Sequence, residues 1–373
     1  MRFGDLIASR ASCLCDKTAV IYNDKEYSYA EIDANANSVA AFLRANGIGV
    51  GNHVVYIAYN SEMYFEILTA CSRIGAVFTP ISWRMCAESI IELVDATDAK
   101  VLFVSKSFLE QLETLKHSIS GERKIIVIDD VDEDNAAYSG CLAYPNEEIS
   151  SADRSGEGCL MQIYTSGTTS IPKGVMLSDN AICSHALGHL TDICQTGNSV
   201  YMCVLPLFHA SSSGAIATLI AGATVVVLER FRPKVYLKTI ERYKATALSL
   251  TPSMFSALLD EIDEGSYDLT SVKSVIYGAE PILAKYMMNM KIGHHSGNIL
   301  QTNHGRKSID LDIQDSEGRE VFKRLVKDYD IVLEGFRPGL MAKYGLDYEN
   351  LKAVNPKLIY CSISTYGQTG PYS

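Results

Sequence analysis

The chain has 373 residues, of which 47% are apolar, and a formal net charge of −11 at pH 7. This length gives room for one large core or two, and the apolar share is typical of a globular protein. The acidic balance excludes a general nucleic-acid binder, so anionic ligands must be held locally by loops and single cations. No apolar run reaches the roughly 18 residues that a membrane-spanning helix needs.

The cysteines and the first residues indicate the compartment. The ten cysteines are scattered without a CxxC pair, which predicts mostly reduced core thiols in a cytoplasmic protein and no metal site. Residues 1–15 carry Arg2, Asp5 and Arg10 and lack the apolar stretch of a signal peptide. We interpret the acidic residues 129–134 as a solvated loop, and a metal site is the alternative.

The first elements are predicted by local signals. Residues 16–29 read as a hairpin with its turn at Asn23-Asp24. Ser28 and Glu31 have the spacing of a capping box, so we expect a helix to start there. Gly47 is expected to end that helix. Its buried face is predicted at helical spacing by Ile32, Ala36, Val39 and Leu43.

Strand and helix signals then alternate along the chain. Asn60, Ser61 and Glu62 read as a helix start after a buried strand. The predicted strands cover residues 54–58, 101–104, 125–128, 221–228, 249–252 and 274–277. This alternation predicts a layered α/β fold.

Residues 163–174 read IYTSGTTSIPKG and are the most informative run of the chain. Small hydroxylated residues around a glycine expose backbone N–H groups and hydroxyl donors, and a lysine adds a positive charge. The pattern predicts a polyphosphate site, and a solvated turn is the alternative. It differs from a Walker A loop, which ends in GK[ST]. The candidate ligands are Thr165, Ser166, Gly167, Thr168, Thr169 and Lys173.

This run resembles the YTSGTTGxPKG signature of the adenylate-forming superfamily, which includes acyl-CoA synthetases. The resemblance implies ATP, Mg²⁺ and coenzyme A as ligands, a small carboxylic acid as substrate and an adenylating-domain fold. Members activate the acid as an acyl-adenylate, and many then transfer it to coenzyme A. Ser170 replaces the usual glycine, as in some carnitine-type CoA ligases.

Two later segments extend the resemblance. VLPLFH at 204–209 places His209 where relatives line or gate the acyl pocket, and a satisfied buried histidine is the alternative. SVIYGAEP at 274–281 is similar to the segment that lies along the adenine ring. There Gly278 would permit close backbone approach, with Ala279, Glu280 and Pro281 flanking the base.

The adenylate-forming pattern stops after Lys291. We expect a truncated adenylating part, because the YGxTE motif, the ribose-binding Asp, the hinge and the small domain with a catalytic Lys do not follow. Which residues are catalytic therefore stays unknown. We expect ligase activity to be impaired.

The remaining segment resembles the early part of a family III CoA transferase. Four runs carry this likeness, namely NHGRKSIDLD at 303–312, SEGREVFKRLV at 316–326, DIVLEGFRPGLM at 330–341 and NPKLIYCSISTYGQTGPY at 355–372. They imply a small doubly wound α/β fragment without that family's catalytic Asp. The resemblance places the loop of Asn303, Arg306 and Lys307 against CoA, and a solvated basic turn is the alternative.

The chain therefore reads as two joined parts, an AMP-binding domain at 1–292 and a CoA-transferase fragment at 293–373. The leading function is acid–CoA ligation. The alternatives are a non-catalytic nucleotide- or acyl-binding remnant of a gene fusion, and a CoA transferase. Each part lacks strands of its parent fold, so we expect exposed edges through which the protein oligomerises.

Overall fold

The computed structural model describes residues 1–108, 123–129, 136–147, 149, 156–165, 173–192, 195–209, 211–262, 266–278, 309 and 311–364. The chain divides into two compact units, unit 1 (Met1–His304) and unit 2 (Gly305–Ser373). This boundary and the expected division at 292/293 fall close together in sequence, and the latter stays a proposal.

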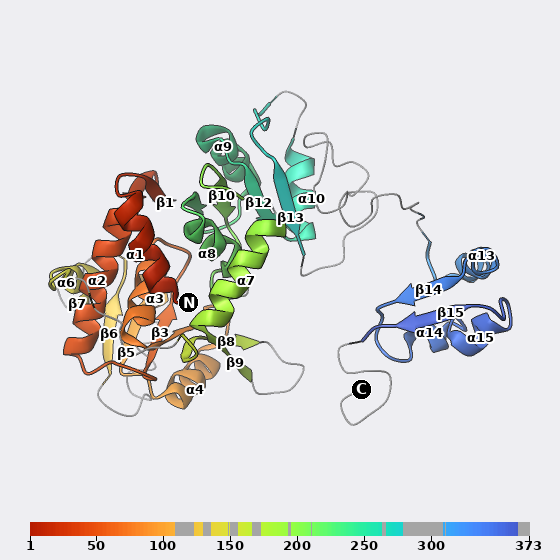
Figure 1. The fold of residues 1–373 in the computed structure, drawn as a ribbon, viewed down its shortest axis with the longest axis horizontal. Helices are drawn as coiled ribbons and strands as arrows, with labels where there is room; N and C mark the ends of the chain where they lie inside the picture. Colours follow the sequence, from red (N-terminus) through yellow and green to blue (C-terminus); the bar gives the residue numbers. More distant parts are fainter. Residues whose placement is uncertain are drawn as a thin grey trace. The chain divides into compact units, whose positions relative to one another are not determined.

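Unit 1 alternates strands and helices (Figure 1). Its described helices are α1 Phe3–Cys13, α2 Tyr29–Ala45, α3 Met63–Ile74, α4 Ala87–Thr97, α6 Tyr138–Leu142, α7 Asp179–Asp192, α8 Ser212–Ile220, α9 Pro233–Tyr243 and α10 Pro252–Glu261. Its described strands are β1 Thr18–Tyr22, β2 Lys25–Ser28, β3 His53–Ile57, β4 Val77–Pro80, β5 Val101–Val104, β6 Lys124–Val127, β7 Ala136–Ala137, β8 Cys159–Thr165, β9 Lys173–Ser178, β10 Val200–Cys203, β11 Thr224–Val227, β12 Ala247–Leu250 and β13 Ser274–Tyr277.

The strands form two sheets. A six-stranded sheet has the order β13-β12-β10-β11-β1-β2, and a seven-stranded sheet has the order β7-β6-β5-β3-β4-β8-β9. All neighbours pair in parallel except β1 with β2 and β8 with β9, which are antiparallel hairpins at one edge of each sheet. The carboxyl ends of the parallel strands of a sheet therefore share one edge, where open α/β sheets bind ligands.

Both sheets are covered on both faces, as parallel strands require. Along β3 and β5, alternate side chains enter different cores. Val54 and Phe103 join the central core with α1, α2, α3 and α8, whereas Val55 and Leu102 join an outer core with α4. On the six-stranded sheet, Val225 faces the central core, and Val226, the next residue, faces α9 and α10. Unit 1 is thus a layered α/β fold (Figure 1).

The first local predictions are confirmed. Asn23 and Asp24 both have positive φ, at 49° and 63°, which is the conformation of a tight hairpin turn. The Ser28 hydroxyl accepts from the Glu31 N–H, and the Glu31 carboxylate accepts from the Ser28 N–H. Gly47 has a φ of 73° directly after α2, as a residue that ends a helix does.

Unit 2 is built around two parallel strands, β14 Ile331–Glu334 and β15 Ile359–Ser362. Its described helices are α13 Ser316–Val326, α14 Leu340–Lys343 and α15 Tyr348–Lys352. They enclose a small core, whose buried residues are Val326, Val332, Met341, Leu346, Leu351 and Leu358. In the described residues, the expected doubly wound fragment is therefore a single strand–helix–strand unit.

Two further expectations concern the whole chain. Within the described ranges, no helix is long and apolar enough to cross a membrane. The cysteines of those ranges are free thiols, but only Cys71, Cys141, Cys183 and Cys203 are buried. The expectation that most cysteines lie in the core is therefore wrong for these residues, because several of them fall at helix ends and on a strand face that solvent reaches.

Candidate functional site

The β8–β9 hairpin holds both ends of the IYTSGTTSIPKG run. Thr165 at the end of β8 lies directly opposite Lys173 at the start of β9. Lys173 is exposed to solvent. The other phosphate-loop candidates, Ser166, Gly167, Thr168 and Thr169, lie outside the described residues. Because Thr165 and Lys173 are paired, the two ends of this segment lie next to each other at the edge of the sheet.

An apolar cavity of about 370 Å³ lies beside this hairpin, between β8, β9, α7 and α8. Its lining is mostly aliphatic, with three polar side chains, and consists of Met161, Ile163, Leu177, Ala181, Ile182, His185, Ser212, Ser213 and Ile216. Ile163 lies two residues before Thr165 on the same strand. An apolar concave site with a few polar groups is the usual form of a small-molecule pocket.

An aromatic cluster lies where the carboxyl ends of both sheets meet. Tyr59 follows β3, Trp83 follows β4, Phe108 follows β5 and Phe208 follows β10. Ring centroids are 4.8 Å apart for Tyr59–Trp83 and Tyr59–Phe108, and 6.1 Å apart for Trp83–Phe208. These contacts bring loops of the two sheets together at one edge.

His209 extends this cluster. Its ring contacts Phe208 edge-on at 4.5 Å between centroids, and the residue is exposed to solvent. Partial desolvation of the imidazole, and then the nearby Arg84 cation, lower the pKa of His209, which favours the neutral ring. Because the residue is exposed, the alternative of a buried histidine is wrong. Its role in an acyl pocket stays a prediction, because His209 does not line the apolar cavity.

Asn60 fixes the loop that carries Phe208 and His209. Its amide donates to the carbonyl oxygens of Leu205 at 3.0 Å and Leu228 at 3.2 Å, and its oxygen accepts from the Leu207 N–H at 2.9 Å. Sequence reasoning had placed Asn60 at a helix start. The signal that could have identified it in the sequence is a polar residue placed between an apolar strand and an apolar helix.

Two buried carboxyl groups lie on and just before α3. Glu66 accepts from the Asn35 amide at 2.8 Å and from the Tyr138 hydroxyl at 2.5 Å. Burial raises the pKa of Glu66 to about 7, although the two hydrogen bonds favour the ionised form and act to lower it. Glu62 accepts from the Tyr27 hydroxyl at 2.6 Å, and burial raises its pKa as well. The sequence predicts Glu62 at a helix start and does not single out Glu66, because nothing in the neighbouring residues indicates that either carboxyl is buried.

Of the adenine-binding candidates, only Gly278 lies within the described residues. It follows β13, and among the described residues no atom lies within 4 Å of a Cβ placed on it. Ala279, Glu280 and Pro281 lie outside the described residues. The same holds for Asn303, Arg306 and Lys307, the candidates for CoA contact.

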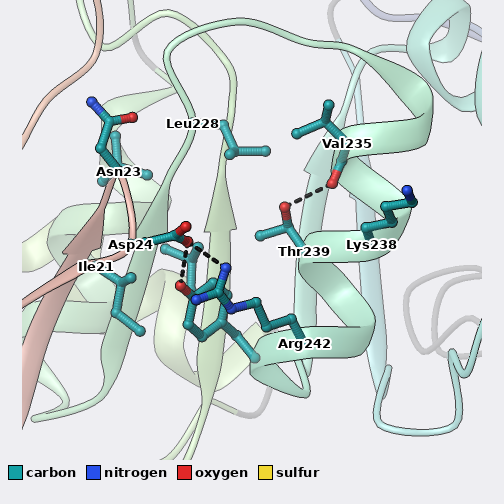
Figure 2. Close-up of a pocket in the computed structure, with 11 residues that line it drawn as sticks. Ile21, Asn23, Asp24, Leu228, Val235, Lys238, Thr239 and Arg242 are labelled. Carbon is teal, nitrogen blue, oxygen red and sulfur yellow. Dashed lines mark hydrogen bonds and ion pairs between the residues drawn. The ribbon is translucent and has the colours of Figure 1, made fainter.

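A second pocket, of about 330 Å³, lies between the β1–β2 turn and α9 (Figure 2). Asp24 in the turn accepts from the Tyr243 hydroxyl at 2.9 Å and lies 2.7 Å from an Arg242 nitrogen. These two bonds lower the pKa of Asp24. This pocket shares no lining residue with the apolar cavity, and its arginine already has a carboxylate partner.

The sequence pattern of the AMP-binding enzyme family matches residues 7–301, which is most of the chain. The chain belongs to the AMP-binding enzyme family. A second match, to CoA-transferase family III, covers residues 283–373. The two matches overlap at 283–301, and the proposed division at 292/293 lies inside this overlap.

Curated relatives of this chain include acid–CoA ligases. The indoleacetate–CoA ligase of Aromatoleum aromaticum is 27% identical over 282 residues, which are 75% of this chain and 55% of that protein. The 4-coumarate–CoA ligase 1 of Solanum tuberosum is 26% identical over 276 residues, 72% of this chain and 50% of that protein. The chain thus spans about half the length of the curated relatives it matches.

Solved structures confirm the fold of the AMP-binding part. An anthranilate CoA ligase in complex with anthranoyl-AMP superposes with a TM-score of 0.72 at 20% identity, covering 77% of this chain and 56% of that chain. A putative long-chain-fatty-acid CoA ligase from Rhodopseudomonas palustris gives a TM-score of 0.70 at 20% identity, covering 75% and 70%. The expected layered α/β class of adenylating domains is therefore confirmed.

Proposed function

We propose that unit 1 binds ATP and a carboxylic acid, joins them as an acyl-adenylate and passes the acyl group to coenzyme A. A carboxylate oxygen attacks the α-phosphorus of ATP, the α–β phosphoanhydride bond breaks and pyrophosphate leaves. The CoA thiolate then attacks the acyl carbon, and AMP leaves with the electron pair of the broken C–O bond. The observation that carries this proposal is the β8–β9 hairpin, which brings Thr165 and Lys173 together beside an apolar cavity.

In this proposal, Lys173 offsets the charge that develops on the departing pyrophosphate. Thr165, Ser166, Gly167, Thr168 and Thr169 supply the remaining phosphate donors, as the sequence pattern implies. Among the described residues, no three His, Cys, Asp or Glu side chains come together at a metal-binding spacing. In the proposal Lys173 offsets part of the pyrophosphate charge, and Mg²⁺ held by the ATP phosphates would offset the rest.

The apolar cavity favours an uncharged acyl group, such as an aliphatic or aromatic one. Among the described residues, its aliphatic lining contains no carboxylate that could balance a cation. The rings that could surround a quaternary ammonium already have cationic neighbours, since Arg84 lies over Trp83 and Arg230 over Tyr59. The carnitine-type subtype rests on Ser170 alone, so we infer a fatty or aromatic acid in its place.

A second candidate function is nucleotide binding without turnover. It is favoured by the overlap of the two family matches at residues 283–301, where the AMP-binding match ends and the CoA-transferase match begins. In relatives, the YGxTE motif that holds phosphate and magnesium follows this point. Loss of those contacts weakens ATP binding by several kcal/mol, because each charge-assisted hydrogen bond contributes roughly 1.5–3 kcal/mol.

The deciding experiment measures ATP binding by calorimetry and acid-dependent exchange of labelled pyrophosphate into ATP. The probes are an aliphatic acid, an aromatic acid and carnitine. Lys173→Ala should weaken ATP binding roughly tenfold or more, whereas the matched change Lys100→Ala, at another exposed lysine, should not.

Exchange that needs the acid supports the ligase, and ATP binding without exchange supports the second candidate. Absence of ATP binding would remove both. Acyl transfer between acyl-CoA and a free acid without ATP would instead indicate the CoA-transferase alternative.

A further inference from the structure

The apolar cavity beside the β8–β9 hairpin has walls from both sheets of unit 1. Met161 comes from β8 of the seven-stranded sheet, whereas Ser212 and Ile216 lie on α8, which connects β10 to β11 of the six-stranded sheet. The width of the cavity therefore depends on how the loop between β10 and α8 is held against the seven-stranded sheet. Asn60 makes that connection.

Asn60 follows β3 of the seven-stranded sheet, and its side chain reaches two loops of the six-stranded sheet. It is 5% exposed and uses both ends of its amide. The nitrogen donates to the carbonyl oxygens of Leu205 and Leu228, and the oxygen accepts from the Leu207 N–H. Because buried backbone groups need partners, these bonds fix where the segments after β10 and β11 lie.

Further hydrogen bonds extend this anchoring from Asn60 to the cavity. Between the two loop residues that Asn60 holds, the Pro206 carbonyl oxygen accepts from the His209 N–H at 3.2 Å and from the Ser211 hydroxyl at 2.6 Å. The His209 carbonyl oxygen in turn accepts from the Ser212 N–H at 3.1 Å, and Ser212 lines the cavity. A shift of the loop at Asn60 would therefore displace the first residues of α8.

We propose that Asn60 is a positioning residue for the carboxylic acid and sets the affinity for the acid through the β10–α8 loop, without touching the acid. This inference rests on the proposed function, in which the cavity receives the acyl group. The run that we propose binds phosphate has both its ends on the β8–β9 hairpin, and the bonds of Asn60 end on the other sheet. Loss of the amide should therefore weaken acid binding much more than ATP binding.

A control variant separates positioning from a general loss of stability. Leu258 in α10 is 1% exposed and belongs to the core on the other face of the six-stranded sheet. Leu258→Ala should destabilise unit 1 at least as much as Asn60→Ala does, because it leaves a cavity in a packed core. It should nevertheless leave the affinity for the acid unchanged, because it does not touch the β10–α8 loop.

Asn60→Asp tests the hydrogen bonds themselves. An ionised carboxylate can still accept from the Leu207 N–H, but its second oxygen faces the carbonyl oxygens of Leu205 and Leu228. Protonation turns that oxygen into a donor and restores part of the bonding of the amide. Burial disfavours the ionised form of a carboxyl group, so acid binding by this variant should recover as pH falls from about 8 to about 5. Acid binding by Asn60→Ala should not recover.

The experiment measures the binding of benzoate, octanoate and ATP to the full chain by calorimetry. Asn60→Ala should weaken binding of the acids roughly tenfold or more, because the cavity wall is misplaced. ATP binding should stay close to that of wild type. Trp83 is the only tryptophan of the chain, and its ring centroid lies 6.1 Å from that of Phe208. Its fluorescence emission in the same samples should shift in Asn60→Ala, because the loop loosens.

Four outcomes would overturn this inference. Equal acid affinity in wild type and Asn60→Ala would do so and leave the proposed function standing. The same holds if Leu258→Ala loses acid binding to the same extent, since Asn60 would then act through stability alone. Lost acid affinity with unchanged Trp83 emission would show that the loop had not moved. A wild type that binds neither acid would remove the ligase function, and this inference with it.

Discussion

The two units differ in how completely helices cover the two faces of their parallel strands. In unit 1, parallel strands such as β3 place Val54 in one core and Val55 in another, so helices cover both faces. In unit 2, the parallel pair β14–β15 places Val332 in a core and leaves Leu333 in solvent. Parallel pairing therefore does not by itself ensure coverage, because the second face needs helices from further segments.

The largest effect should come from emptying the unit 1 core. Phe78 in β4 is fully buried and contacts the rings of Tyr56 and Tyr64. Phe78→Ala should lower the free energy of unfolding of unit 1 by about 3–5 kcal/mol. Leu333→Ala in unit 2 should change it by less than about 0.5 kcal/mol. Urea unfolding followed by circular dichroism measures both.

Unfolding should be measured on dilute protein, so that association of chains does not contribute to the result. If Leu333→Ala costs as much as Phe78→Ala there, the contrast between the two units is wrong.

The next largest effect should come from a buried carboxyl group, a feature in which the two units differ. Among the described residues, all buried polar side chains lie in unit 1. The folded pKa of Glu66 is raised from 4.5 to about 7, so the fold disfavours the ionised form. Below pH 4.5 the carboxyl is protonated in the folded and the unfolded chain, so Glu66 does not change the free energy of unfolding. As pH rises from 4.5 to about 7, ionisation in the unfolded chain lowers that free energy.

Glu66→Gln should remove this loss, because the amide stays neutral and the Tyr138 hydroxyl can accept from it. The variant should match wild type at acidic pH and be more stable by about 3 kcal/mol at alkaline pH. Glu92→Gln, at an exposed glutamate, is the control and should leave the pH profile unchanged. Equal pH profiles for wild type and Glu66→Gln would show that Glu66 is ionised without penalty.

A smaller effect is expected at Asn60, which joins the loops of the two sheets within unit 1. Asn60→Ala leaves the Leu207 N–H and the carbonyl oxygens of Leu205 and Leu228 without this partner. Stability should fall by about 2 kcal/mol. The near-ultraviolet circular dichroism of the aromatic cluster should weaken too, because the Phe208 loop loosens. Asn198→Ala, at an exposed turn, should change neither signal.

Local signals predicted much of the fold. The Asn23-Asp24 turn and the Ser28–Glu31 capping box depend on residues a few positions apart, so the sequence contains all that they need. The same holds for Gly47, whose positive φ ends α2. The run that we propose binds phosphate is likewise contiguous, whereas the pairing of β8 with β9 that brings its ends together comes from the structure.

Contacts between distant segments were decided by the tertiary structure alone. The sequence placed Asn60 at a helix start, but its partners are 145 to 168 residues away. The aromatic cluster joins loops from β3, β4, β5 and β10, and the apolar cavity needs two strands and two helices to close it.

The exposed side of the β14–β15 sheet shows the same distinction in unit 2. The sequence determined that Ile331, Leu333 and Ile359 alternate with core residues, because side chains on a strand point to opposite faces in turn. It did not determine which of those faces the helices would cover. Coverage is a property of how segments pack in three dimensions, since burial depends on neighbours from elsewhere in the chain.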